Sequence, residues 1–231
     1  MRQFTFAKKT DREDYRVGTI VKSCLVGEEG AATAREICLK LKDSVSKHET
    51  YSFNHGDLLK SLLATQPAAV LDGLCCGEAN EIKLGTRIIE DLGRFDKNLL
   101  DAVPEGDLLG WCDEEPDGRY VIAAAGISIS LDPEWTRPRR WTNIALTLLE
   151  KAPDRVALLR QFVRQFRPRS WSGSRAAIVA SYAKLLDELE GHSDLALTEF
   201  VAQEKVRLTK EIEVERRAET LQDRATDERF E

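Results

Sequence analysis

Two identical helix-junction signatures constrain this chain more than any other feature of its sequence. Both read Leu-Leu-x-x-x-Pro-x-x-Val, at residues 62–70 and 148–156. Their first residues lie 86 positions apart (148 minus 62), which is twice 43. Helix pairs of HEAT and armadillo proteins repeat every ~40–47 residues. The spacing therefore predicts an all-α fold, a HEAT- or armadillo-like solenoid of stacked helical hairpins.

Other junctions extend this pattern along the chain. Pro67, Pro116, Pro153 and Asp194 each follow a Leu-Leu pair, and they are separated by 49, 37 and 41 residues (116 minus 67, 153 minus 116, 194 minus 153). Proline disfavours helical geometry in the residue before it and suits a first helical turn, so it can end one helix and begin the next. The uneven spacing leaves a compact all-α bundle open. A mixed fold also stays open, because the apolar residues of 120–131 could form a strand.

Helical periodicity divides the chain into three parts. Residues 1–13 are predicted to form a flexible arm and residues 14–214 a helical repeat domain, which includes helices at about 14–26, 31–46 and 68–76 and one with an N-cap at Asn80. A long polar helix begins near Ser193, and its part from 215 to 231 is expected to be a charged, solvated tail. A capping helix is favoured over a dimerisation zipper, because few apolar residues recur late in it.

Composition and charge bound the classes of function. The chain has 231 residues, of which 42% are apolar, enough to build a real core. Forty acidic and 34 basic side chains give a net charge of −6, so the chain as a whole is not attracted to nucleic acid or to an anionic membrane. No segment is apolar enough to span a bilayer. Five cysteines without metal-ligand spacing favour reduced thiols and a cytoplasmic location.

Catalytic motifs are not recognisable in the sequence. There is no Gly-Lys-Ser/Thr phosphate loop and no His-Glu-x-x-His zinc motif, so we expect no enzyme, no cofactor and no metal. A cysteine-dependent hydrolase remains a remote alternative, with Cys75 or Cys76 as nucleophile, His55 as base and Asp57 or Asp72 as acid. Packing in a helical core is the favoured interpretation of these thiols.

One segment departs from the acidic character of the chain. Residues 135–175 hold ten basic and two acidic side chains, a local charge of +8 (10 minus 2), interleaved with aromatic residues. The favoured interpretation is structural: tryptophans fill the core and arginines pair with acids of neighbouring helices. The segment could also bind an acidic protein surface or nucleic acid. The candidate binding residues are Arg137, Arg139, Arg140, Arg164, Arg167, Arg169, Trp171 and Arg175.

A resemblance adds to this interpretation. Residues 58–231, above all the stretches 141–149, 152–166, 171–175 and the charged tail, resemble the helical C-terminal regions of large bacterial multidomain proteins that often carry NTPase modules. The resemblance implies HEAT-like helices and a sensing or scaffolding role, and it implies no catalytic residues. We therefore expect a non-catalytic protein-interaction module of a bacterial cytosolic system. Its partner would be another protein, with nucleic acid as the alternative.

Overall fold

The structure is a computed structural model that describes residues 11–92, 98–131, 138–168 and 171–227. These residues form eleven α-helices and three short 3-10 helices. Across these ranges the β interactions are limited to one isolated antiparallel bridge, between Ser130 and Trp141. The predicted all-α class is confirmed. Contacts divide the chain into two compact units, residues 1–128 and 129–231.

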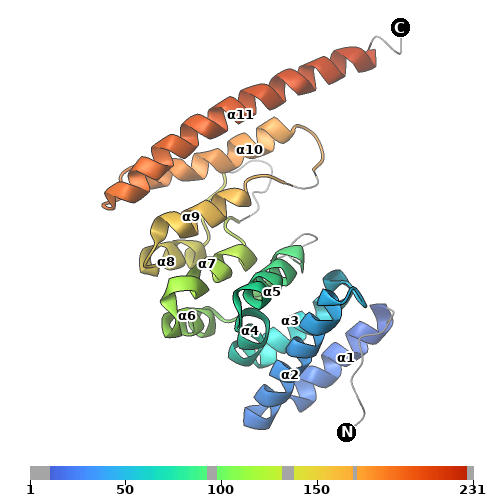
Figure 1. The fold of residues 1–231 in the computed structure, drawn as a ribbon. Coiled ribbons are helices and arrows are strands. Elements are labelled where there is room, and N and C mark those ends of the chain that lie inside the picture. Colours follow the sequence, from blue (N-terminus) through green and yellow to red (C-terminus); the bar gives the residue numbers. More distant parts are fainter. Residues whose placement is uncertain (1–10, 93–97, 132–137, 169–170, 228–231) are drawn as a thin grey trace. The chain divides into compact units, whose positions relative to one another are not determined.

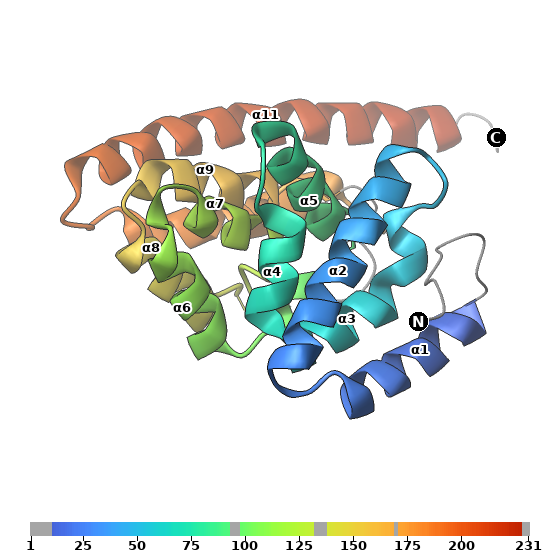
Figure 2. The same cartoon turned by 60° about the horizontal axis from the view of Figure 1, so that its bottom comes forward.

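The described residues of unit 1 form seven α-helices, and most of these pack on the next helix but one along the chain. Helix α1 lies against α3 and α2 against α4, and α6 and α7 then pack on α4 and α5 (Figures 1 and 2). The bounds are α1 Asp11–Cys24, α2 Gly27–Ser46, α3 Gly56–Thr65, α4 Pro67–Cys75, α5 Ala79–Leu92, α6 Glu105–Glu114 and α7 Pro116–Gly126. Short 3-10 turns at Ser52–His55 and Leu99–Ala102 join them.

The predicted proline junctions in unit 1 are present. Pro67 begins α4 and Pro116 begins α7, each in the first helical turn, where a missing N–H removes no helical hydrogen bond. The leucines of the first signature are fully buried in the core. Asn80 differs from the prediction: α5 begins at Ala79, so Asn80 lies inside the first turn, and the backbone N–H of Glu78 donates to Glu81 Oε2 at 3.1 Å instead.

The segment that could have been a strand is mostly helical. Helix α7 continues to Gly126 and buries a row of small residues, Ala123, Ala124 and Ala125. A helix that buries these small side chains can approach its neighbours closely. Beyond it, only Ser130 takes part in a β-bridge. A strand in this segment is therefore not observed.

Unit 2 is built around a long helical hairpin. Its helices are α8 Asn143–Lys151, α9 Arg155–Arg164, α10 Arg175–Ala183 and α11 Leu195–Asp227, with a 3-10 segment, Lys184–Leu189, after α10. Helix α11 runs antiparallel along α10 and continues past the start of α10 (Figure 1). The second signature differs from the first here, because Pro153 precedes α9 and Asp154 caps that helix by accepting from the Ala157 N–H at 2.8 Å.

The first and last helices have boundaries that differ from those of the predicted N-terminal arm and C-terminal tail. Helix α1 begins at Asp11, so residues 11–13 of the predicted arm are helical, while residues 1–10 lie outside the described ranges. Helix α11 passes residue 215 without interruption and ends at Asp227. Within the described ranges, none of the helices has the length and apolar character needed to cross a membrane.

Candidate functional site

The arginine-rich segment lies in unit 2, and its members fall in three places. Arg139 and Arg140 precede α8, Arg164 is in the last turn of α9, and Arg167 follows α9. Trp171 precedes α10, and Arg175 is the first residue of that helix. The other two predicted site residues, Arg137 and Arg169, lie outside the described residues.

Arg139 is held by contacts within unit 2. Its guanidinium lies 3.9 Å from the centroid of the Tyr182 ring. Its Nε donates to Ser181 Oγ at 2.9 Å, and Nη1 donates to Ser130 Oγ at 3.2 Å. A guanidinium stacked on an aromatic face keeps the N–H donors in its own plane free for hydrogen bonds at its edge. Arg139 therefore joins the segment before α8 to α10.

Two further arginines bind carboxylates of α11. Arg167 forms a forked contact with Glu211, from Nε to Oε1 at 2.9 Å and from Nη2 to Oε2 at 2.6 Å. Arg175 contacts Glu215 Oε1 through Nη1 at 2.5 Å. Glu211 and Glu215 are four residues apart, so they lie on the same face of α11. The structural interpretation of the segment, in which arginines pair with acids of a neighbouring helix, holds for both residues.

A third carboxylate on this face of α11 caps α10. Glu219 Oε1 accepts from the backbone N–H of Ala176 at 3.0 Å, and Oε2 accepts from Ser174 Oγ at 2.8 Å. The first N–H groups of a helix have no partner inside the helix and favour negative charge. Glu211, Glu215 and Glu219 therefore form a carboxylate row, spaced by four residues, that contacts Arg167, Arg175 and the start of α10.

The two described tryptophans of the segment have opposite environments. Trp141 is 5% exposed, donates from Nε1 to the Leu185 carbonyl at 2.8 Å, and packs against the rings of Phe162 and Phe166. Trp171 is 50% exposed, and the guanidinium of Arg175 lies 5.1 Å from its ring centroid. The prediction that tryptophans fill the core holds for Trp141, whereas Trp171 presents half of its surface to solvent.

Three further arginines of unit 2 are less engaged. Arg140 and Arg164 are exposed, and Arg164 donates to the neutral Gln161 Oε1 at 2.9 Å. Arg160, one turn before Arg164, is also exposed and lies over the Phe200 ring at 5.4 Å. Among the described residues, none of these three forms an ion pair with a carboxylate. Two of these arginines, Arg160 and Arg164, lie on α9.

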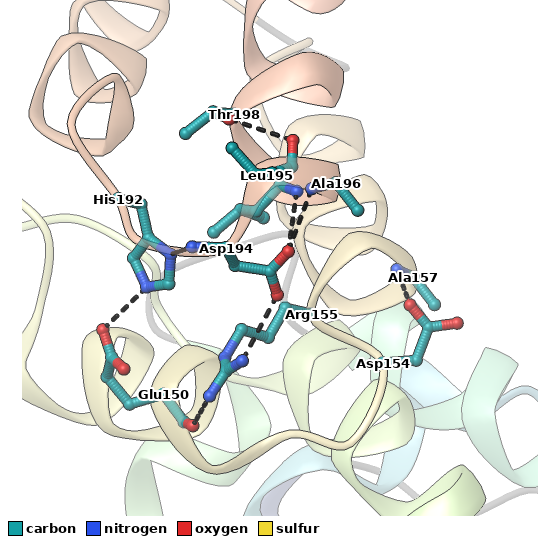
Figure 3. A network of polar contacts seen from close by, with 10 residues as sticks. Glu150, Asp154, Arg155, Ala157, His192, Asp194, Leu195, Ala196 and Thr198 are labelled. Carbon is teal, nitrogen blue, oxygen red and sulfur yellow. Dashed lines mark hydrogen bonds and ion pairs between the residues drawn. The ribbon is translucent and has the colours of Figure 1, made fainter.

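A polar network ties the start of α11 to the junction between α8 and α9 (Figure 3). Arg155 donates to Asp194 Oδ2 at 3.2 Å and to the Glu150 carbonyl at 2.8 Å. His192 Nδ1 accepts from the Asp194 N–H at 3.0 Å, while Nε2 lies 3.1 Å from Glu150 Oε1. The backbone N–H of Leu197 and the Arg155 side chain lower the pKa of Asp194. The network fixes the turn that leads into α11.

Cys38, Cys75 and Cys76 lack the lowered pKa of a nucleophilic thiol. Burial raises the pKa of Cys38 and of Cys75 to about 12, whereas a reactive thiol needs a lowered pKa. Burial and the Asp72 carboxylate also raise the pKa of Cys76. The proposed base, His55, is buried and has its Nε2 2.9 Å from Thr50 Oγ1. Among the described residues, no group of three or more His, Cys, Asp or Glu side chains could hold a metal ion.

The rates at which the cysteines react with a thiol reagent test which of them are buried. In the native protein at pH 8, we expect a charged disulfide reagent to modify the exposed Cys24 first and to spare Cys38, Cys75 and Cys112 until the chain unfolds, because all three are buried. Following the release of the reagent's chromophore measures the rates, and Cys24→Ser should remove the fast phase. A fast reaction that persists in this variant and maps to Cys76 would instead support a nucleophilic thiol.

The carboxylate row also predicts a dependence on pH. The N–H of Ala176 and the Ser174 hydroxyl lower the pKa of Glu219 below its ordinary 4.5. A lowered folded-state pKa contributes stability above the unfolded value, and that contribution is lost as the pH falls through the folded value. We expect the amide shift of Ala176 to titrate with a midpoint below 4.5 and the titration to disappear in Glu219→Gln. A midpoint at or above 4.5 would contradict the cap.

The acidic half of this site was not predicted from the sequence. The prediction located the arginines but described residues beyond 214 only as a solvated tail. The signal was present, since Glu211, Glu215 and Glu219 continue, at helical spacing, the face of α11 that carries the buried Leu208 and Ile212. Their role required knowing that α11 folds back along α10. No protein family model, curated protein or solved structure matches this chain.

Proposed function

We propose that the protein is a non-catalytic protein-interaction module, serving as a scaffold or sensor arm of a bacterial cytosolic system. The proposal includes a HEAT-like stacking of its helices. In unit 1, the packing of α1 on α3, α2 on α4, and α4 on α6 supports it, because alternate helices also stack in two layers in helical repeat proteins. The raised pKa values of Cys38, Cys75 and Cys76 support the non-catalytic part.

The observation that carries the proposal is the half-exposed Trp171 beside Arg175. Tryptophan and arginine dominate the binding energy of many protein interfaces. Here the side chain is 50% exposed, and the arginine over its ring is fixed by Glu215. A rigid aromatic side chain loses little conformational entropy on binding. We therefore assign Trp171 as the anchor of a protein-binding surface.

Nucleic-acid binding is the second candidate, and the exposed arginines of α9 favour it. Arg160 and Arg164 lie one turn apart and, within the described ranges, have no carboxylate partner, so they are available to phosphates. Glu211, Glu215 and Asp194, however, already offset the charges of Arg167, Arg175 and Arg155. This leaves a small patch, so protein binding is the preferred function.

Affinity capture with matched variants tests the proposal. The immobilised full chain, Trp171→Ala and Tyr51→Ala are each exposed to extract of the source organism, with and without nuclease. Tyr51 is a fitting control, because it is an exposed aromatic side chain of unit 1. We expect Trp171→Ala to lower the yield of a specific protein by about tenfold or more. Tyr51→Ala and nuclease treatment should leave that yield unchanged.

Three results would count against the preferred function. Equal capture by the full chain and Trp171→Ala would remove Trp171 as the anchor. Capture that disappears with nuclease, or with Arg160→Ala/Arg164→Ala, would favour nucleic acid. Since Trp171 is half-exposed, its substitution should leave the melting temperature nearly unchanged, so a loss of capture would report binding rather than folding.

A further inference from the structure

The C-terminal part of α11 is attached to unit 2 in a different way from the rest of that helix. Leu197, Val201 and Leu208 are fully buried, and Ile212 is 9% exposed. Beyond Ile212, the side chains described through residue 224 are exposed except for the half-buried Glu215 and Glu219. The core contacts of α11 therefore end at Ile212, and the carboxylates of Glu215 and Glu219 hold the segment 213–227, which we term the strap.

The surface beneath the strap is an anion receptor made of Ser174, Arg175 and the Ala176 N–H. Arg175 supplies a guanidinium to Glu215, while the Ser174 hydroxyl and the Ala176 N–H supply two donors to Glu219. Two carboxylates four residues apart are separated by about 6 Å along a helix axis. The receptor therefore matches a helix that carries acidic residues at positions i and i+4.

The strap does not use this receptor fully. Arg175 contacts Glu215 through Nη1, and within the described residues its buried Nε has no hydrogen-bond acceptor. An arginine binds a carboxylate best through two parallel bonds. Trp171, next to Arg175, also keeps half of its surface uncovered. A ligand that engaged Arg175 in forked geometry and covered Trp171 would make contacts that the strap lacks.

The strap is also suited to release. Arg175 binds Glu215 through one N–H, and single ion pairs between partly exposed groups contribute only about 0–1 kcal/mol each, less than a forked pair such as Arg167 with Glu211. Segments with few buried apolar contacts open locally at a small fraction of the global unfolding free energy. Glu211, bound by Arg167 and next to Ile212, would keep the remainder of α11 in place. The strap can thus open without unfolding the hairpin.

We propose that the receptor is a docking surface for an acidic helical segment of a partner protein, which displaces the strap. The partner helix places carboxylates four residues apart on Arg175 and on the first turn of α10, and an apolar side chain on Trp171. The strap occupies the same donors at high effective concentration and lowers the apparent affinity of the partner. The proposal rests on the proposed function, since it names the chemistry of the partner that Trp171 anchors.

A peptide competition on the full chain tests the proposal. The probe is a fluorescein-labelled peptide of residues 208–227 of this chain, an acidic sequence that carries both carboxylates. The test variant, Glu215→Gln/Glu219→Gln, weakens the strap. The matched control, Glu213→Gln/Asp223→Asn, removes the same two charges from exposed positions of the same helix. Fluorescence anisotropy at low ionic strength measures binding.

We expect the peptide to bind the test variant about tenfold or more tightly than it binds the control or the unaltered chain, because the weakened strap no longer competes. Adding Arg175→Ala to the test variant should abolish this gain, and a peptide with glutamine at both positions should not bind. Equal affinity for test and control variants, or no binding to any variant, would overturn the proposal.

The outcome also separates this proposal from the proposed function. If protein capture depends on Trp171 but the peptide does not distinguish test from control, the strap proposal fails and the interaction module stands. If the peptide shows the expected difference but Trp171→Ala does not change capture, the receptor binds acidic helices and the assignment of Trp171 as anchor fails.

Discussion

Trp141→Ala should lower the free energy of unfolding by about 3–5 kcal/mol, the largest loss that we expect from one substitution in unit 2. The indole is 5% exposed and packs on the rings of Phe162 and Phe166, so its removal leaves a large cavity. It also leaves the Leu185 carbonyl without its donor. Urea denaturation followed by circular dichroism measures the loss.

Two controls separate the contributions of Trp141. Trp141→Phe keeps an aromatic ring but removes the Nε1 donor, so we expect a loss of about 1–3 kcal/mol. Trp171→Ala, at the half-exposed tryptophan, should change the stability by only about 0.5 kcal/mol. If Trp141→Ala and Trp171→Ala lowered the free energy of unfolding equally, the assignment of Trp141 as buried and Trp171 as half-exposed would be wrong.

Gly85→Ala should destabilise unit 1 by about 3 kcal/mol, because the substitution forces helix α5 away from α4. A Cβ at this position would lie 1.8 Å from the Leu74 carbonyl oxygen, which belongs to the backbone and cannot rotate away. The α4–α5 contact would have to separate or shift. Thermal unfolding followed by circular dichroism should show a clearly lower melting temperature.

Gly110→Ala provides the matched control, since this glycine lies inside α6 with nothing within 4 Å of an added Cβ. Alanine is about 0.8–1 kcal/mol more favourable than glycine in a helix interior, so this variant should be more stable than the unaltered chain. If Gly85→Ala behaved like Gly110→Ala, the close approach of α5 to the end of α4 would be wrong.

The helices were predictable from local patterns. Prolines that lack an N–H mark the starts of α4 and α7, and leucines at helical spacing mark the buried faces, so the all-α class follows from residues close together in the chain. Secondary structure could not be predicted where the same local pattern is compatible with both a helix and a strand. The residues of α7 suit a strand as well as a buried helix, because small and β-branched side chains fit both.

The candidate site was only half predictable, for a physical reason. A run of arginines is visible in one segment, but its charge depends on what folds against it. Arg167 meets Glu211, which lies 44 residues away, and Arg175 meets Glu215, 40 residues away. Local periodicity carries no information on such pairing. The environment of Trp171 also depends on this pairing, since Glu215 fixes the arginine that lies over its ring.

A double-mutant cycle on Arg167 and Glu211 tests the central claim, that the arginine-rich segment binds the carboxylate row of α11. Urea denaturation would give the free energy of unfolding of the unaltered chain, Arg167→Gln, Glu211→Gln and the double variant. The forked, partly buried contact predicts a coupling energy of about 1 kcal/mol or more. Additive effects, with a coupling below about 0.3 kcal/mol, would contradict the claim.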